Sequence, residues 1–204
     1  NPSKTFQIVP AQAVITANNQ KVTYNGNEQA YNDFTVTNGS VVVSYYGSEA
    51  DRTAGVNELE VALNAGTYYV KAGVAADASY SAATSKAVKL TIKKAPASAL
   101  GLKAENYSGK YDGEEHVVPV SVNDEDGTKI SYSLDNETWR EDTPTWTDAT
   151  DGPVPVYVKA ENPNYETATT QATVEITKRE VTLTSASAQK TFDGTPLTDS
   201  TVTV

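Results

Sequence analysis

The sequence predicts an all-β fold made of tandem β-sandwich repeats. Three observations support this: the chain is rich in Thr, Val, Tyr, Ser and Asn, apolar residues alternate with polar ones over short runs, and a set of motifs recurs along the chain. In Val88–Ile92, for example, alternate residues are Val, Leu and Ile, which places them on one face of a strand. Turn signals such as Asn25-Gly26 and Asp112-Gly113 separate these runs, a rhythm typical of a sandwich or barrel.

The internal repeat is the most informative feature. An aromatic residue followed by Asn or Asp and then Gly starts at Tyr24, Tyr111 and Phe192, so successive copies are 87 and 81 residues apart. The tetrapeptide Tyr-Val-Lys-Ala occurs at 69–72 and again at 157–160, a spacing of 88. Motifs that recur in the same order at such a period indicate a repeat architecture.

These spacings predict the domain organisation. We expect a last strand of an upstream repeat at 1–9, repeat 1 at 10–94, repeat 2 at 95–178, and the truncated start of a third repeat at 179–204. The last segment carries apolar residues for one sandwich face, so we expect it to be ordered by strand pairing with another copy, or by packing back onto repeat 2.

Individual elements follow from local patterns. Val118–Val122 and Val174–Ile176 alternate as strands. Val56–Leu63 fits either a helix face or a strand face, and its short length favours a strand with Leu59, Val61 and Leu63 on one side. Asn123–Gly127 is predicted to be a hairpin turn with Asp-Gly at its tip.

The junctions at 93–97 and 177–181 are predicted to be short and extended, which favours a rod-like array. Pro96 biases Ala95 toward extended geometry, and no flexible Gly/Ser run intervenes.

Repeat 1 contains Asn64-x-Gly66-x-Tyr68-x-Val70-x-Ala72. This is similar to the tyrosine corner of immunoglobulin domains, with Val where those domains carry a disulfide Cys. The fold class is therefore predicted to be tandem immunoglobulin-like β-sandwich repeats. We expect Tyr68 to be largely buried, with its hydroxyl bonded to a main-chain group.

Several longer motifs resemble the YDG/MBG-type (mostly beta, glycine-rich) repeats of large bacterial surface proteins. They are Tyr111-Asp112-Gly113, the segment Tyr132–Trp139, the segment Val158–Tyr165 and the segment Lys190–Leu197. The resemblance implies immunoglobulin-like domains in extracellular, cell-wall-associated proteins with a structural or adhesive role. It supplies no catalytic residues and no cofactor.

Composition excludes several other functions. The formal net charge is −10, which repels nucleic acid, and no run of about 20 apolar residues is present for membrane insertion. There is no Cys, so disulfides and thiolate chemistry are excluded, which fits secreted proteins of Gram-positive bacteria. The expected function is a non-catalytic stalk or spacer whose partners are neighbouring repeats of the same chain.

Candidate chemistry is sparse. The single histidine, His116, lacks a paired nucleophile and is expected to be a surface or edge-strand residue. The acidic run at 123–127 lacks the alternating oxygen ligands of an EF-hand, so a turn explains it more simply than calcium binding. The carboxylates are scattered, and no pair recurs in both repeats as glycoside hydrolysis would require.

Two further candidates remain. Trp139 and Trp146, with Tyr132 and Tyr165, are candidate ligand contacts for a host glycan or protein. This is the alternative function, an adhesin module. The alternative to ligand contact is that Tyr132 and one Trp face the core. The recurrent lysines at 71 and 159 suggest an isopeptide crosslink, but strand alternation points both away from the core.

Overall fold

The computed structural model describes residues 7–185, 187–198 and 202–203, and nearly all of its regular structure is β-strand. The described residues group into two compact units. The first comprises residues up to 103 with 121–130 and 159–169, and the second comprises 104–120, 131–158 and 170 onward.

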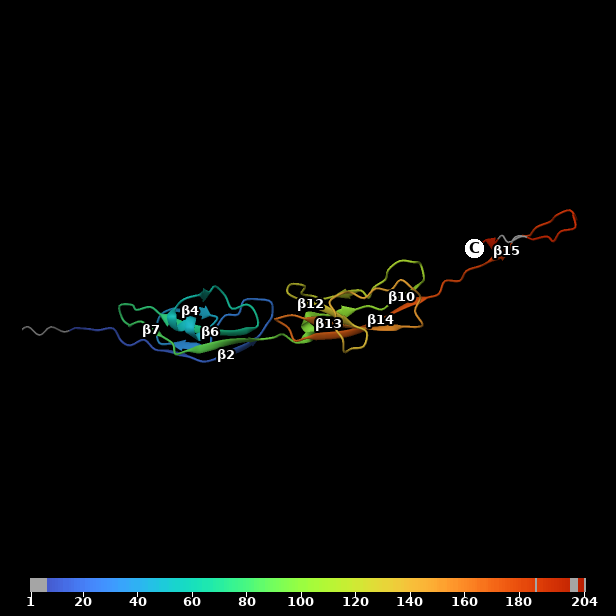
Figure 1. Cartoon of the computed structure of the whole chain (residues 1–204). Helices are drawn as coiled ribbons and strands as arrows, with labels where there is room; N and C mark the ends of the chain where they lie inside the picture. Colours follow the sequence, from blue (N-terminus) through green and yellow to red (C-terminus); the bar gives the residue numbers. More distant parts are fainter. Residues whose placement is uncertain (1–6, 186, 199–201, 204) are drawn as a thin grey trace, which may run out of the picture. The chain divides into compact units, whose positions relative to one another are not determined.

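The first sandwich is built around one large sheet (Figure 1). Its strand order is β2-β8-β6-β4-β5, and the short strand β7 pairs with β6. A second, two-stranded sheet is formed by β1 and β3. The strands are β1 Ile15–Ala17, β2 Gln20–Thr23, β3 Phe34–Val36, β4 Val41–Tyr46, β5 Glu58–Leu59, β6 Gly66–Val74, β7 Ala83–Thr84 and β8 Val88–Lys93.

The core of this sandwich lies between the two sheets. The fully buried Val70 and Leu90 come from the centre of the large sheet, and they cluster with Ala17 of β1 while Phe34 of β3 packs against them. Strand β8 shows the predicted alternation, with Val88, Leu90 and Ile92 buried. The arrangement is a β-sandwich, as the alternating pattern predicted.

A second sandwich repeats the same connectivity. Its main sheet has the order β10-β14-β13-β12, and β9 and β11 form the small sheet. In each main sheet an early strand pairs in parallel with the last one, β2 with β8 and β10 with β14, and all other pairs within the first large sheet are antiparallel. The strands are β9 Lys103–Ala104, β10 Tyr107–Lys110, β11 Val120–Ser121, β12 Lys129–Ser133, β13 Val154–Glu161 and β14 Ala168–Thr177.

Equivalent residues of the two sequence repeats take equivalent places. Val70 on β6 and Val158 on β13 are both fully buried, as predicted. Tyr80 forms a parallel bridge with Ala11, and Tyr165 forms the corresponding bridge with Ala95. The fold class is therefore all-β, with tandem immunoglobulin-like sandwich repeats.

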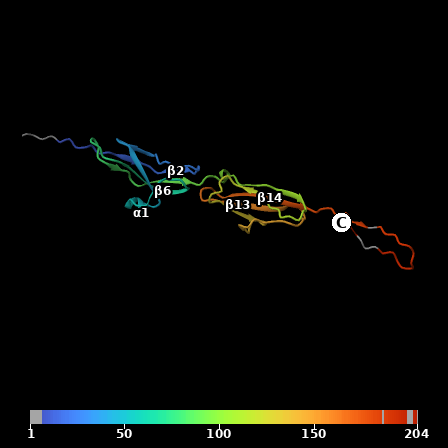
Figure 2. The ribbon, with the colours of Figure 1, turned by 90° about the horizontal axis from the view of Figure 1, so that it is seen from above.

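Two short helices were not predicted. Helix α1, Glu49–Ala54, lies against β4 and β6 (Figure 2). The side chain of Ser48 caps it by accepting from the Asp51 amide, and Gly55 ends it in the left-handed conformation. Helix α2, Ala97–Leu100, follows Pro96, whose backbone is extended. The junction predicted to be extended over 93–97 therefore ends one residue early, because Ala97 begins the helix.

Several element predictions need correction. Of the predicted strand at Val118–Val122 only Val120–Ser121 is a strand, and residues 7–9, the described part of the predicted strand at 1–9, are not in a strand. Only Glu58–Leu59 of the predicted strand at Val56–Leu63 is a strand, and Leu59 is exposed while Ala62 is buried. The pairing of β5 with β4 ends after two residues, so the rest of the segment is free to turn Ala62 inward.

The turn at Asn123–Gly127 is not a hairpin. It connects β11 and β12, which belong to different sheets. Gly127 does adopt the left-handed conformation expected of its Asp-Gly tip, with φ of 67°. The Asp-Gly signal predicts a local turn, but the partner of each flanking strand is set by distant residues.

Beyond β14 the described chain forms one further strand pair, β15 Thr184–Ser185 with β16 Val202–Thr203. Four apolar side chains of this segment are well exposed: Val181, Leu183, Phe192 and Leu197. Packing back onto repeat 2 would bury these side chains, so their exposure argues against that alternative. Parts of the predicted flanking fragments, residues 1–6, 186, 199–201 and 204, lie outside the described residues.

Candidate functional site

The recurring aromatic-Asn/Asp-Gly triplet builds the same turn at three places. The side-chain oxygen of Asn25, Asp112 or Asp193 accepts a hydrogen bond from the amide two residues later, at 2.9–3.0 Å. The following glycines, Gly26, Gly113 and Gly194, all have φ between 80° and 85°. Asn and Asp favour such turns, and Gly takes positive φ without strain, so the motif is accounted for by backbone geometry.

The single histidine packs into this turn. The ring of His116 stacks on Tyr107 with centroids 4.4 Å apart, and its Nε2 lies 2.9 Å from Oδ1 of Asp112. The pKa of Asp112 is lowered, chiefly by the Glu114 amide and then by His116. The backbone of His116 bridges Trp146 in both directions. These contacts fit the predicted edge-strand role.

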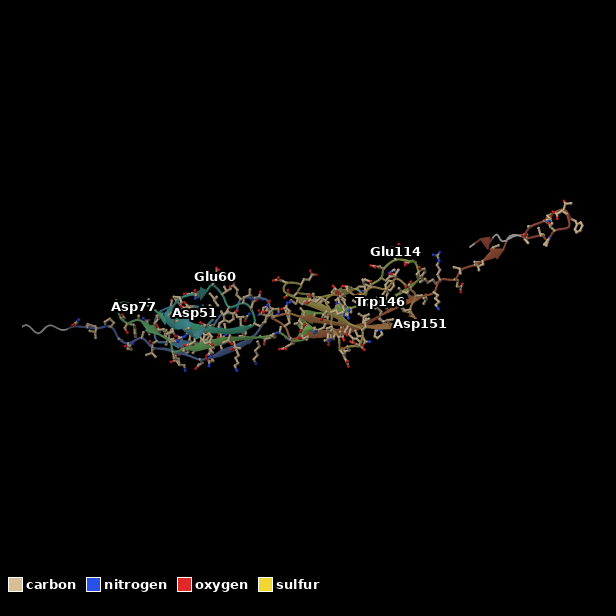
Figure 3. All side chains as sticks on the ribbon, viewed as in Figure 1. Asp51, Glu60, Asp77, Glu114, Trp146 and Asp151 are labelled. Carbon is tan, nitrogen blue, oxygen red and sulfur yellow. The ribbon has the colours of Figure 1, made fainter. Side chains whose placement is uncertain are left out.

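The two candidate ligand-contact tryptophans are both half-buried. Trp146, labelled in Figure 3, pairs through its backbone with His116, and Trp139 follows the loop after β12. A shallow hollow beside that loop is lined by Tyr132, Leu134, Arg140 and other loop residues, and neither tryptophan lines it. The hollow therefore does not depend on either indole.

The loop within the Tyr132–Trp139 segment is organised by one carboxylate. Asp135 accepts hydrogen bonds from the amides of Thr138 and Glu137 and from the hydroxyl of Ser133, at 2.7–2.8 Å. These bonds favour the ionised form and hold the pKa of Asp135 far below its usual range, with the Thr138 amide as the largest cause. Its Oδ1 is thereby engaged by the loop itself.

The acidic run forms a closed turn. Thr128 donates from its amide to the Glu125 carbonyl and from its hydroxyl to the Asp124 carbonyl. Across the described part of the chain, no three His, Asp or Glu side chains gather in a way that could hold a metal ion. Figure 3 shows the labelled Glu114 and Asp151 apart from each other on the second sandwich.

The two recurrent lysines lie between buried neighbours on their strands. Lys71 is partly exposed while Val70 and Ala72 are buried. Lys159 is also partly exposed, and its Nζ lies 3.4 Å from Oε2 of Glu161. The predicted strand parity is confirmed, and both lysines point away from the core.

Tyr68 forms the predicted corner contact. Its hydroxyl donates to the Asn64 carbonyl at 2.9 Å, although the side chain is partly rather than largely buried. The most buried tyrosine with such a contact is one that sequence reasoning missed. Tyr31 is 3% exposed, and its hydroxyl lies 2.6 Å from the Asn18 carbonyl, with burial as the main cause of its raised pKa. Tyr31 sits in a polar stretch that gives no periodic signal.

Comparison with known proteins finds likeness only in structure. No family model matches the chain, and no curated protein matches it. The structure of Sidekick-1 immunoglobulin domains 1-5 aligns over 87% of this chain and 43% of its own length, at 11% identity and a TM-score of 0.29. This chain therefore spans less than half of that structure.

Two other solved structures give similar values. Mouse Cadherin-23 EC22-24 aligns over 84% of this chain and 68% of its own, at 13% identity and a TM-score of 0.33. The tandem Ig repeats of Dlar align over 83% of this chain and all of their own, at 13% identity and a TM-score of 0.29. With scores this low, the fold assignment rests on the sheets described above. No helix among the described residues is long and apolar enough to cross a membrane.

Proposed function

We propose that this chain is a non-catalytic stalk segment of an extracellular, cell-wall-associated repeat protein of a Gram-positive bacterium, of the YDG/MBG type. One observation carries the proposal: the residues that recur between the sequence repeats serve turns and cores. The aromatic-Asn/Asp-Gly triplets build turns, and Val70 and Val158 fill equivalent cores. A repeated binding or catalytic site would instead place recurrent polar groups around a cleft.

The domain division belongs to the same proposal. Repeat 1 at 10–94 and repeat 2 at 95–178 would be successive stalk modules, and residues 179–204 would belong to a third. The acidity of the chain suits a stalk, because like-charged neighbours repel and remain soluble.

The competing proposal is an adhesin module that binds host glycan or protein through Trp139 and Trp146. Both indoles are half-buried, so each presents only part of its ring. The two proposals make opposite statements about these side chains, which allows one experiment to separate them.

The test displays the full chain on a cell surface between an anchor and a small affinity tag. A stalk should increase the access of a bulky tag-binding probe compared with an anchor fused directly to the tag. Trp139→Ala and Trp146→Ala should leave that access unchanged. The displayed cells are then screened against a glycan array and matrix proteins. Binding that disappears with either substitution would overturn the stalk in favour of the adhesin.

A further inference from the structure

The turn at Asn162–Tyr165 is fixed by an unusual buried amide. Asn162 is only 5% exposed, and its Nδ2 donates to the Asp126 carbonyl at 2.9 Å and to the Thr128 hydroxyl at 2.8 Å. Its Oδ1 accepts from the Asn164 amide at 2.8 Å. A buried amide with its donors and acceptor engaged holds the local backbone in one conformation. Asn164 and Tyr165 are thereby presented in fixed positions.

These two side chains meet residues that are a whole repeat away in sequence. Oδ1 of Asn164 accepts from the Ala65 amide at 2.8 Å, and its Nδ2 donates to Oδ1 of Asn64 at 3.1 Å. The ring of Tyr165 meets Tyr24 edge to face, with centroids 5.4 Å apart and planes at 78°. All of these residues belong to the first compact unit, although they come from different sequence repeats.

The backbone around the turn supports the same contact. Ala95 is 3% exposed; its amide donates to the Asn164 carbonyl at 2.9 Å, and its carbonyl accepts from the Glu166 amide at 2.8 Å. The Tyr24 amide donates to the Lys93 carbonyl at 2.8 Å. Ala95 follows Lys93 by only two residues, so Tyr24 and the turn are both tied to the same short stretch of chain.

We propose that the Asn162–Tyr165 turn is a docking element whose partner is the surface of Tyr24, Asn64 and Ala65, and that it couples the stability of repeat 2 to that of repeat 1. This inference rests on the proposed tandem-repeat function and adds to it. Paired amide hydrogen bonds and an edge-to-face ring pair are directional contacts that repeats joined only by a flexible linker would lack.

The chain contains its own control for this contact. Tyr111 occupies the place of Tyr24 in the second sandwich, because its amide donates to the Thr177 carbonyl at 2.9 Å as that of Tyr24 does to Lys93. Tyr111 is 40% exposed, whereas Tyr24 is partly buried. The repeat spacing places Pro153 where Ala65 lies, and proline has no amide proton to donate.

The experiment follows unfolding of the full chain by tryptophan fluorescence. The chain has two tryptophans, Trp139 and Trp146, both in repeat 2, so their signal reports on repeat 2 alone. Tyr24→Ala and Asn64→Ala change repeat 1. If the turn couples the repeats, Tyr24→Ala should lower the tryptophan-detected melting temperature by roughly 4–8 °C, and Asn64→Ala should lower it by a smaller amount.

A double-mutant cycle makes the assignment to the contact specific. Combining Tyr24→Ala with Tyr165→Ala should lower the melting temperature by less than the sum of the two single shifts, because each substitution removes the same ring contact. Tyr111→Ala combined with Tyr165→Ala should be additive. Asn64 is exposed, so its replacement tests the contact even if Tyr24→Ala unfolds repeat 1.

An unchanged tryptophan transition in both Tyr24→Ala and Asn64→Ala would overturn the docking element. Additive shifts for Tyr24 and Tyr165 would do the same. Neither result would affect the stalk proposal, since freely hinged repeats still separate a tip from an anchor, and the display experiment tests that function independently.

Discussion

At the scale of single residues, the tyrosines show which side-chain roles the sequence reveals. Tyr68 was predictable because it lies on the alternating face of β6, two positions before the buried Val70, and its hydroxyl does meet main chain. Tyr31 was not, because it lies outside any strand and its hydroxyl donates to the carbonyls of Asn18 and Asp33, which no periodic pattern indicates. Periodicity identifies residues on regular strands, whereas residues between strands are placed by distant partners.

The corner tyrosine provides the first prediction. Tyr68→Phe removes the hydroxyl bond to the Asn64 carbonyl and should lower the free energy of unfolding by about 1 kcal/mol. Tyr69→Phe is the matched control, since its ring contacts Lys89 through its face and Phe retains that face. Urea unfolding followed by circular dichroism measures both. Equal losses of unfolding free energy in the two variants would show that the Tyr68 hydroxyl bond to Asn64 does not stabilise the fold.

Two turn glycines provide the second prediction. Gly26 and Gly39 both have positive φ, but a Cβ on Gly26 would meet open space, whereas one on Gly39 would lie 2.5 Å from Cγ2 of the buried Val74. Gly26→Ala should therefore cost only the conformational strain, about 1–2 kcal/mol. Gly39→Ala adds overpacking and should cost about 2–5 kcal/mol in total. Chemical denaturation ranks the pair, and a smaller loss for Gly39→Ala would contradict the packing shown here.

At the scale of elements, long alternating runs were predictable and short or capped ones were not. Strands β8 and β14 follow from alternation alone. Helix α1 has six residues, too few for a periodic pattern, and its signals are the Ser48 cap and Gly55. The site motifs behaved likewise: the aromatic-Asn/Asp-Gly turns follow from local chemistry, but the contacts of Asn162 and Asn164 do not, because their partners lie far away in sequence.

The loop around Asp135 gives an element-scale prediction of pH dependence. Its folded-state pKa is lowered below the unfolded value of about 3.9, so the stability it contributes is fully present above that value and is lost as the pH falls further. The melting temperature of the wild type should therefore decline below about pH 4. Asp135→Asn should reduce that decline while leaving the profile between pH 5 and 8 flat.

Thermal melts at stepped pH measure this effect, with Asp126→Asn as the control. The side chain of Asp126 is exposed in a turn, so its replacement removes a charge without removing a set of hydrogen bonds like that of Asp135. An acid profile changed equally by both substitutions would show that general charge, rather than the Asp135 hydrogen bonds, sets the pH response.

At the scale of the whole molecule, the repeat was predictable because the same motifs occur in the same order in both sequence repeats. The same order of strands follows each copy of the motif set, and the main sheets share their parallel first-to-last pairing. The sequence does not reveal which repeat residues face a neighbour, since Tyr24 and Tyr111 have the same motif but different exposure. The exposure of each ring depends on whether a residue distant in sequence packs against it, as Tyr165 does against Tyr24.

The final prediction concerns residues 181–197. Phe192 is 92% exposed, and Val181 and Leu183 are 70% and 67% exposed, although strands β15 and β16 pair nearby. A two-stranded pair is marginal in water, and exposed apolar side chains beside a strand edge favour association with another chain. We therefore expect this segment to pair with a second copy of the chain as the protein concentration rises.

Limited proteolysis measures this pairing. Chymotrypsin should cut after Phe192 first in dilute solution, and the cut should slow at high protein concentration. Phe192→Val would move the first cut while keeping an apolar side chain at this position, whereas Leu183→Asp should abolish the concentration dependence. Cleavage after Phe192 at one rate across all concentrations, read by mass spectrometry, would show that the segment remains unpaired.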